Sequence, residues 1–116
     1  MKDAAANSFL PLSPATLHIL LSLAGENLHG YGIMQEVARQ SEGRYKLGPG
    51  TLYDNLQRLM KQSLVEETAS PEEANARRRY YRLTSLGRRV LSGEIARLEG
   101  VIKEARLRRV PQPGRI

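Results

Sequence analysis

The sequence contains no cysteine and no tryptophan among its 116 residues, and only one phenylalanine. Without cysteine, the chain forms neither a disulfide framework nor a zinc site with thiolate ligands. No apolar run approaches the roughly 20 residues that cross a bilayer, and the richest stretch, 17–24, has the length of a buried helix. The first residues lack the basic and then long apolar pattern of a secretory signal. These absences predict a cytoplasmic protein without a membrane partner.

Histidine is also scarce, since His18 and His29 are the only two in the sequence. Neither has an acidic partner at a useful helical spacing, and the two lack the carboxylate or cysteine spacing of a metal site. The neighbouring glutamates at 66–67 and 72–73 fall on an expected strand and loop, without any sign of a pocket. The sequence therefore predicts no enzyme, no metal and no cofactor.

Basic residues are abundant and unevenly distributed. The formal net charge is +6. Residues 44–62 hold 4 basic and 1 acidic side chains, and residues 77–109 hold 11 basic and 3 acidic ones. Between them, residues 63–76 carry four glutamates as their only charged side chains. Two basic segments separated by an acidic one favour a localised face that binds a polyanion, and a well-solvated basic surface is the alternative.

Apolar periodicity and capping residues predict three short helices. The first starts at Ser13-Pro14 and ends at Gly25, the second covers about 30–41, and the third covers about 49–62. The third helix is amphipathic, with one apolar face and an opposite face of small, amide and charged side chains. Its expected outward positions are Thr51, Asp54, Asn55, Arg58 and Lys61.

Two β-favouring runs, 64–68 and 79–83, flank a polar stretch and predict a hairpin with a long loop. Three short helices followed by such a hairpin follow the order of a winged helix-turn-helix. Thr84 can cap a last helix whose apolar residues repeat at heptad spacing, namely Leu91, Ile95, Leu98, Ile102 and Ala105. We therefore predict an α+β, mostly α fold. Its parts are a flexible segment (1–12), a winged helix-turn-helix domain (13–84), a C-terminal dimerisation helix (85–109) and a disordered tail (110–116).

The third helix and the hairpin carry the predicted contacts to double-stranded DNA. An α-helix fits the major groove, so Thr51, Asn55 and Arg58 are expected to reach base edges. The three consecutive arginines at the return of the hairpin repel one another unless an anion is near, which favours phosphate contacts. The predicted phosphate-binding residues are Lys46, Lys61, Arg77, Arg78 and Arg79. The alternatives are a solubilising charge run and a winged-helix module that binds a protein without binding DNA.

The heptad seam of the last helix requires a partner. Ile19 and Leu23 give the first helix a second apolar strip, so a homodimer that uses both helices would cover both surfaces. The alternative is that the last helix folds back on its own domain. A two-fold symmetric dimer would place two recognition helices roughly 34 Å apart, which matches a pseudo-palindromic operator.

Several segments resemble the PadR family in order and spacing. They are 21–24, 28–33, 50–53 with Leu56 and 58–59, then 64–66 and 79–84 with Gly87, and the similarity spans roughly residues 13–100. The resemblance implies a dimeric transcriptional repressor whose third helix enters the major groove and whose wing contacts flanking DNA. The short C-terminal part resembles the compact subgroup with a single helix there. By position, Tyr53 would hydrogen-bond a phosphate, or would fill space between helix and wing.

Some members of that family bind flat aromatic drugs between tryptophans at the dimer interface. This chain has no tryptophan, and its last helix has no aromatic residue. That form of drug recognition is therefore not expected here, and a small-molecule effector of another kind stays open.

Overall fold

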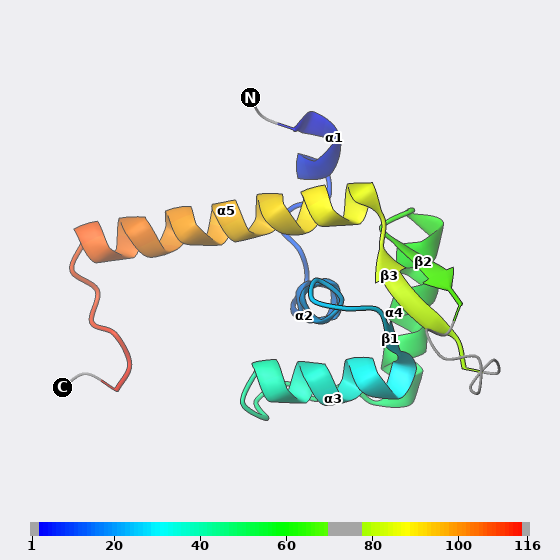
Figure 1. The fold of residues 1–116 in the computed structure, drawn as a ribbon. Coiled ribbons are helices and arrows are strands. Elements are labelled where there is room, and N and C mark those ends of the chain that lie inside the picture. The colour runs from blue at the N-terminus through cyan, green and yellow to red at the C-terminus, as the bar shows by residue number, and fades with distance from the viewer. Residues whose placement is uncertain (1–2, 70–77, 115–116) are drawn as a thin grey trace.

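The computed structural model describes residues 3–69 and 78–114. They form a mostly helical protein with a small antiparallel sheet, as the sequence predicts (Figure 1). The elements in chain order are α1 (Ala4–Asn7), α2 (Pro14–Ser22), β1 (Leu28–His29), α3 (Gly30–Gln40), α4 (Pro49–Lys61), β2 (Val65–Thr68), β3 (Tyr80–Leu83) and α5 (Ser85–Leu107). Residues 110–114 form neither helix nor strand.

Side-chain caps start α2 and α5 where the sequence predicts them. Ser13 caps α2, because its hydroxyl accepts a hydrogen bond from the Thr16 N–H group at 3.2 Å. Thr84 caps α5 in the same way, accepting from the Gly87 N–H group at 2.9 Å. α3 starts with a less common cap, since Nδ1 of His29 accepts from the Gly32 N–H group at 3.0 Å.

The sheet contains a strand that the sequence does not reveal. Its order is β1-β3-β2, with both pairs antiparallel. β2 and β3 are the predicted hairpin, whereas β1 has two residues, Leu28 opposite Tyr81 and His29 opposite Tyr80. A two-residue strand shows no periodicity of its own and is defined only by its pairing. β1 attaches the start of α3 to the returning strand of the wing.

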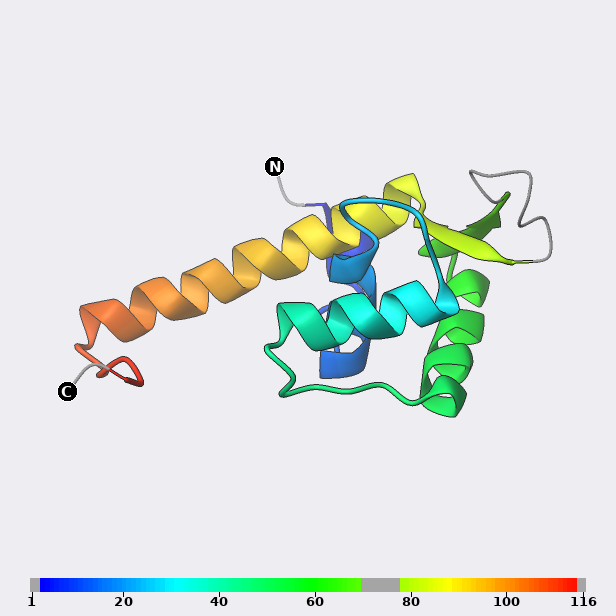
Figure 2. The same cartoon turned by 60° about the horizontal axis from the view of Figure 1, so that its bottom comes forward.

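The core of the domain is built around α2, which lies between α3 and α5 (Figures 1 and 2). Ile19 of α2 and its C-cap residue Leu23 are fully buried there, and Leu91 of α5 is only 7% exposed. The prediction that these three side chains are free to contact a second copy was therefore wrong. An apolar helix with neighbours on two sides buries both of its strips within its own domain.

The N-terminal segment packs on α5, although the sequence predicted a flexible one. Ala6 of α1 is fully buried, and Asp3 pairs with Arg89 at 2.7 Å. The segment also lies close to Gly93 of α5, where an added Cβ atom would lie 3.1 Å from Oδ1 of Asn7 and 3.3 Å from the Leu10 side chain. Residues 3–12 thus belong to the folded domain.

A buried carboxylate ties this segment to α5. Glu94 is 1% exposed, accepts the Leu12 N–H group at 2.9 Å and pairs with Arg97 at 2.5 Å. The Arg97 hydrogen bond lowers the pKa of Glu94 more than burial raises it. The stability that this carboxylate contributes is therefore present at neutral pH and lost as the pH falls through its lowered pKa.

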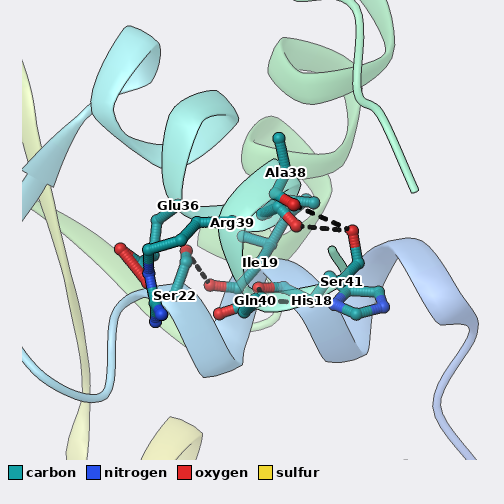
Figure 3. A network of polar contacts seen from close by, with 9 residues as sticks. His18, Ile19, Ser22, Glu36, Ala38, Arg39, Gln40 and Ser41 are labelled. Atoms are coloured by element: carbon teal, nitrogen blue, oxygen red, sulfur yellow. Dashed lines mark hydrogen bonds and ion pairs between the residues drawn. The ribbon is translucent and has the colours of Figure 1, made fainter. Parts of the chain in front are cut away.

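Polar side chains join α2, the end of α3 and the loop that follows, and Figure 3 shows the contacts between α2 and the end of α3. Gln40 donates a hydrogen bond to the carbonyl oxygen of His18 at 2.8 Å, which joins the end of α3 to α2. The hydroxyl of Ser41 accepts from the Tyr45 N–H group at 3.0 Å, and the Tyr45 ring stacks on His18 with centroids 5.1 Å apart. These contacts fix residues 40–45, the end of α3 and the first part of the loop before α4, relative to α2.

The C-terminal half of α5 extends beyond the rest of the domain in both views (Figures 1 and 2). None of the described helices is long and apolar enough to cross a membrane. The described residues also contain no cluster of three histidine or acidic side chains that could hold a metal ion.

Candidate nucleic-acid interface

The exposed face of α4 carries polar and basic side chains. Thr51, Arg58 and Lys61 are exposed on the helix, and Lys46 is exposed in the loop before it. Gly48 is the N-cap, and among the described residues no side chain caps the first turn by a hydrogen bond. The open N–H groups at a helix N-terminus, together with the helix dipole, favour an anion. This face can therefore contact both base edges and a phosphate.

Asn55 does not lie on this face, contrary to the prediction that it points outward. Asn55 is only 8% exposed, because it lies about 40° around the helix axis from the buried Leu59. Its Nδ2 donates to the carbonyl oxygen of Thr51 at 2.8 Å, and its Oδ1 accepts from Arg58 at 2.6 Å. The amide is thus hydrogen-bonded within the protein and is not presented to solvent.

Arg58 connects α4 to α2, and the residue as a whole remains exposed. Its Nη2 donates to Oδ1 of Asn55 and, at 3.0 Å, to Oγ1 of Thr16, a residue that is 6% exposed. A guanidinium has five N–H donors in a fixed plane, so donors remain for a ligand after these two bonds. Asn55 and Thr16 therefore fix the orientation of the Arg58 guanidinium.

Gln57 lies on the exposed face of α4 and was not among the predicted site residues. It lies one turn after Tyr53 and one turn before Lys61, both of which were predicted, and this spacing is the signal that could have identified it. An amide side chain on a groove-facing helix can read adenine. Gln57 is thus better placed for that role than Asn55.

A groove lies between α4, the start of α3 and the wing, and we call it the wing–helix groove. Its volume is about 520 Å³, and it is lined by His29, Gly30, Tyr31, Tyr53, Arg78, Arg79 and Tyr81. It brings together three predicted residues, Tyr53, Arg78 and Arg79. Both arginines are exposed. The predicted Arg77 lies outside the described residues.

His29 and Tyr31 also line the groove, and no sequence argument placed them there. Nε2 of His29 lies 3.2 Å from Nη1 of Arg78, and the His29 ring stacks on Tyr31 with centroids 6.5 Å apart. β1 brings them beside the arginines by pairing with β3, which the sequence did not show. Tyr31 is 63% and Tyr53 49% exposed, so both rings are accessible from the groove.

Tyr53 packs tightly against Gly30 at the floor of the groove. A Cβ atom on Gly30 would overlap the Tyr53 hydroxyl and would lie 2.9 Å from the ring carbon that carries it. Tyr81 lies nearby, and burial, followed by the charge of Glu67, raises the pKa of its hydroxyl. Tyr81 therefore keeps its proton at neutral pH and adds no negative charge to the groove.

The predicted dimer residues divide into buried and exposed ones. Leu98 and Ala105 are half-buried on α5, whereas Ile95 and Ile102 are 36% and 50% exposed. Val101, which was not predicted, is 55% exposed on the same projecting half of the helix. The large apolar side chain exposed on α2 is Leu21, whereas the predicted Ile19 and the C-cap residue Leu23 are buried.

Comparison with known proteins adds to this geometry. A model of the transcriptional regulator PadR-like family matches residues 19–93. Transcriptional regulator Rv3488 of Mycobacterium tuberculosis is 36% identical over 88 residues, which cover 76% of this chain and 78% of that protein. A PadR family transcription regulator from Clostridium difficile superposes with a TM-score of 0.66 at 27% identity, covering 82% of this chain and 97% of that one.

A Bacillus subtilis PadR has been solved in complex with operator DNA. It superposes with a TM-score of 0.63 at 18% identity over 91% of this chain and 52% of that one, a likeness of fold. The family model covers well over half of the chain, and the Mycobacterium relative aligns along most of its length. The chain therefore belongs to the PadR-like family of transcriptional regulators.

Proposed function

We propose that this protein binds duplex DNA sequence-specifically as a homodimer and represses transcription in the cytoplasm. One observation carries the proposal. The exposed face of α4, whose N-terminus has no side-chain cap, lies beside a groove that contains two exposed arginines. A helix face that reaches base edges and adjoining cations that reach phosphates are the two parts of sequence-specific DNA binding. The operator complex of the Bacillus subtilis relative supports the same use of the fold.

The residues divide by role. Thr51 and Gln57 would contact base edges from the exposed face of α4, and Arg58 would reach a base or the backbone. The first-turn N–H groups after Gly48 would receive a phosphate oxygen. The other proposed phosphate contacts are Lys46, Tyr53, Lys61, Arg78 and Arg79, with Arg77 outside the described residues.

Asn55→Ala is expected to weaken binding to all duplexes alike, by about 0.5–1.5 kcal/mol. The substitution removes one of the two acceptors that orient Arg58, and it removes no group that faces DNA. Affinities for an operator and for variants with single base-pair changes measure the effect. Thr51→Ala is the comparison, because the loss of a base contact there should be confined to one base pair. A loss confined to one base pair in Asn55→Ala would restore this residue to the base-reading set.

Gly30→Ala is expected to lower the affinity for every duplex by about 0.5–1.5 kcal/mol while leaving the thermal stability nearly unchanged. The new Cβ atom displaces the Tyr53 hydroxyl, which lies at the free end of a side chain that can move. Gly32→Ala is the matched control, because its Cβ atom would meet His29 at an ordinary 3.5 Å. Equal affinities in the two variants would show that Tyr53 contributes nothing to binding.

The projecting half of α5 supports the homodimer. Ile95, Val101 and Ile102 expose apolar surface on a helix segment that leaves its own domain. Burying apolar surface of this kind against a second copy lowers the free energy and so favours the dimer. A dimer that binds a pseudo-palindrome would repress by covering a promoter, a mechanism that requires no contact with the polymerase.

A footprinting experiment tests the dimeric mode. Duplexes that the protein selects from a random pool are bound and treated with a cleavage reagent. We expect one protected region with two related half-sites about one helical turn apart. Protection of a single unrepeated half-site would contradict the dimer, and a selection that enriches no sequence would contradict specific binding.

A further inference from the structure

The wing carries a carboxylate beside one of its proposed phosphate-binding arginines. Oε1 of Glu67 on β2 lies 3.5 Å from Nη1 of Arg79, and both side chains are exposed. Glu67 is directly opposite Tyr81 across the strand pair. Because side chains alternate along a strand, Glu67 shares the sheet face of the buried Val65. It therefore lies at the edge of the wing–helix groove, beside two of the residues that line it.

The fold does not depend on this ion pair. Arg79 is 75% exposed and Glu67 43% exposed, and ion pairs at such exposed sites contribute little to stability. The other described arginines of the wing have different partners. Arg78 lies beside the ring of His29, and Arg82 pairs with Glu66 at 2.7 Å on the opposite face of the sheet. A weak pair at the edge of a polyanion site affects binding more than folding.

We propose that Glu67 competes with DNA phosphate for Arg79 and so lowers the sequence-independent part of the DNA affinity. The inference rests on the proposed function. A phosphate that binds the Nη1 donor of Arg79 must displace the carboxylate, which then remains close to a second negative charge. The sequence-independent affinity is almost entirely electrostatic, so it bears the full cost of this displacement. The freed carboxylate also takes up a counterion, which reduces the net release of salt on binding.

The test uses Glu67→Gln, which keeps the size of the side chain and removes its charge. Binding of the full-length protein to a scrambled duplex is measured by fluorescence anisotropy across a salt series. We expect the variant to bind about three- to tenfold more tightly at moderate salt, with a log–log salt slope steeper by up to about one unit. Unchanged affinity and slope would overturn the proposal.

Glu104→Gln is the matched control. Glu104 forms an exposed ion pair with Arg108 at 2.9 Å, so the substitution changes the net charge equally and also breaks one exposed pair. This pair lies near the C-terminal end of α5, which Figure 1 shows far from β2 and β3. We expect its affinity and slope to match the parent protein. An equal gain in both variants would show that net charge alone acts, which overturns the proposal.

A double-mutant cycle separates competition for Arg79 from general repulsion. In an Arg79→Gln background, Glu67→Gln should have little further effect, because the cation for which it competes is gone. A gain that persists in that background overturns the proposal. If the parent protein binds neither a selected nor a scrambled duplex at low salt, the proposed function itself fails, and this outcome is distinct from all the others.

Discussion

Ile102→Glu is expected to convert the dimer to a monomer and to weaken operator binding by about a hundredfold or more. Ile102 is 50% exposed on the projecting half of α5, so an isolated chain tolerates a charge there. A dimer that covers this position would have to bury the carboxylate without a partner, which is costly. Two linked half-sites bind about 10²–10⁴ times more tightly than one, and a monomer loses that gain.

Light scattering after size-exclusion chromatography measures the mass, and anisotropy with a selected duplex measures the affinity. Leu107→Glu is the control, because Leu107 is 70% exposed on α5 but lies about 140° around the helix from Ile102. This variant should remain dimeric and bind as the parent does. If Ile102→Glu also stays dimeric, the proposed interface on α5 is wrong.

Gly87→Ala is expected to lower the free energy of unfolding by about 3 kcal/mol. Gly87 lies buried in the first turn of α5, where a Cβ atom would overlap the carbonyl oxygen of Leu64 and lie 3.0 Å from its carbon. The clash is with backbone, and that backbone is fixed. The Leu64 oxygen accepts the Thr84 N–H group at 3.1 Å, and the Thr84 hydroxyl donates to the Ser63 carbonyl oxygen.

Urea unfolding followed by circular dichroism measures this loss. Gly100→Ala is the control in the same helix, because its added Cβ would meet no described atom within 4 Å apart from the adjoining residues and backbone of α5 itself. Alanine favours a helix interior over glycine by up to about 1 kcal/mol, so this control should stabilise the protein. Stabilisation in both variants would show that α5 does not dock closely on the chain before β2.

The helices and the hairpin could be predicted because their signals are local. Ser13 and Thr84 cap the helices that their positions indicate, and the apolar spacing in α4 matches its buried face. What depends on tertiary contacts was missed. β1 exists only through its pairing with β3, and α1 is held by its packing on α5, where Ala6 is buried.

The site was predicted in part for the same reason. Tyr53, Arg78 and Arg79 lie together as the order of helix and wing suggested. The prediction for Asn55 was wrong because this residue lies at the border between the apolar and polar faces of α4. There a helical projection does not show on which side the amide packs. The prediction that Ile19 and Leu23 contact a second copy was wrong for a different reason. The sequence does not show that α2 has neighbours on both of its apolar sides.

Sequence-specific DNA binding is tested most directly by comparing a selected duplex with its scrambled version across a salt series. We expect saturable binding to the selected duplex at moderate salt, about a thousandfold or more tighter than to the scrambled one. The gap should persist as salt rises, because base contacts do not depend on counterion release. Equal and steeply salt-dependent binding to both duplexes, or no binding at low salt, would contradict sequence-specific DNA binding.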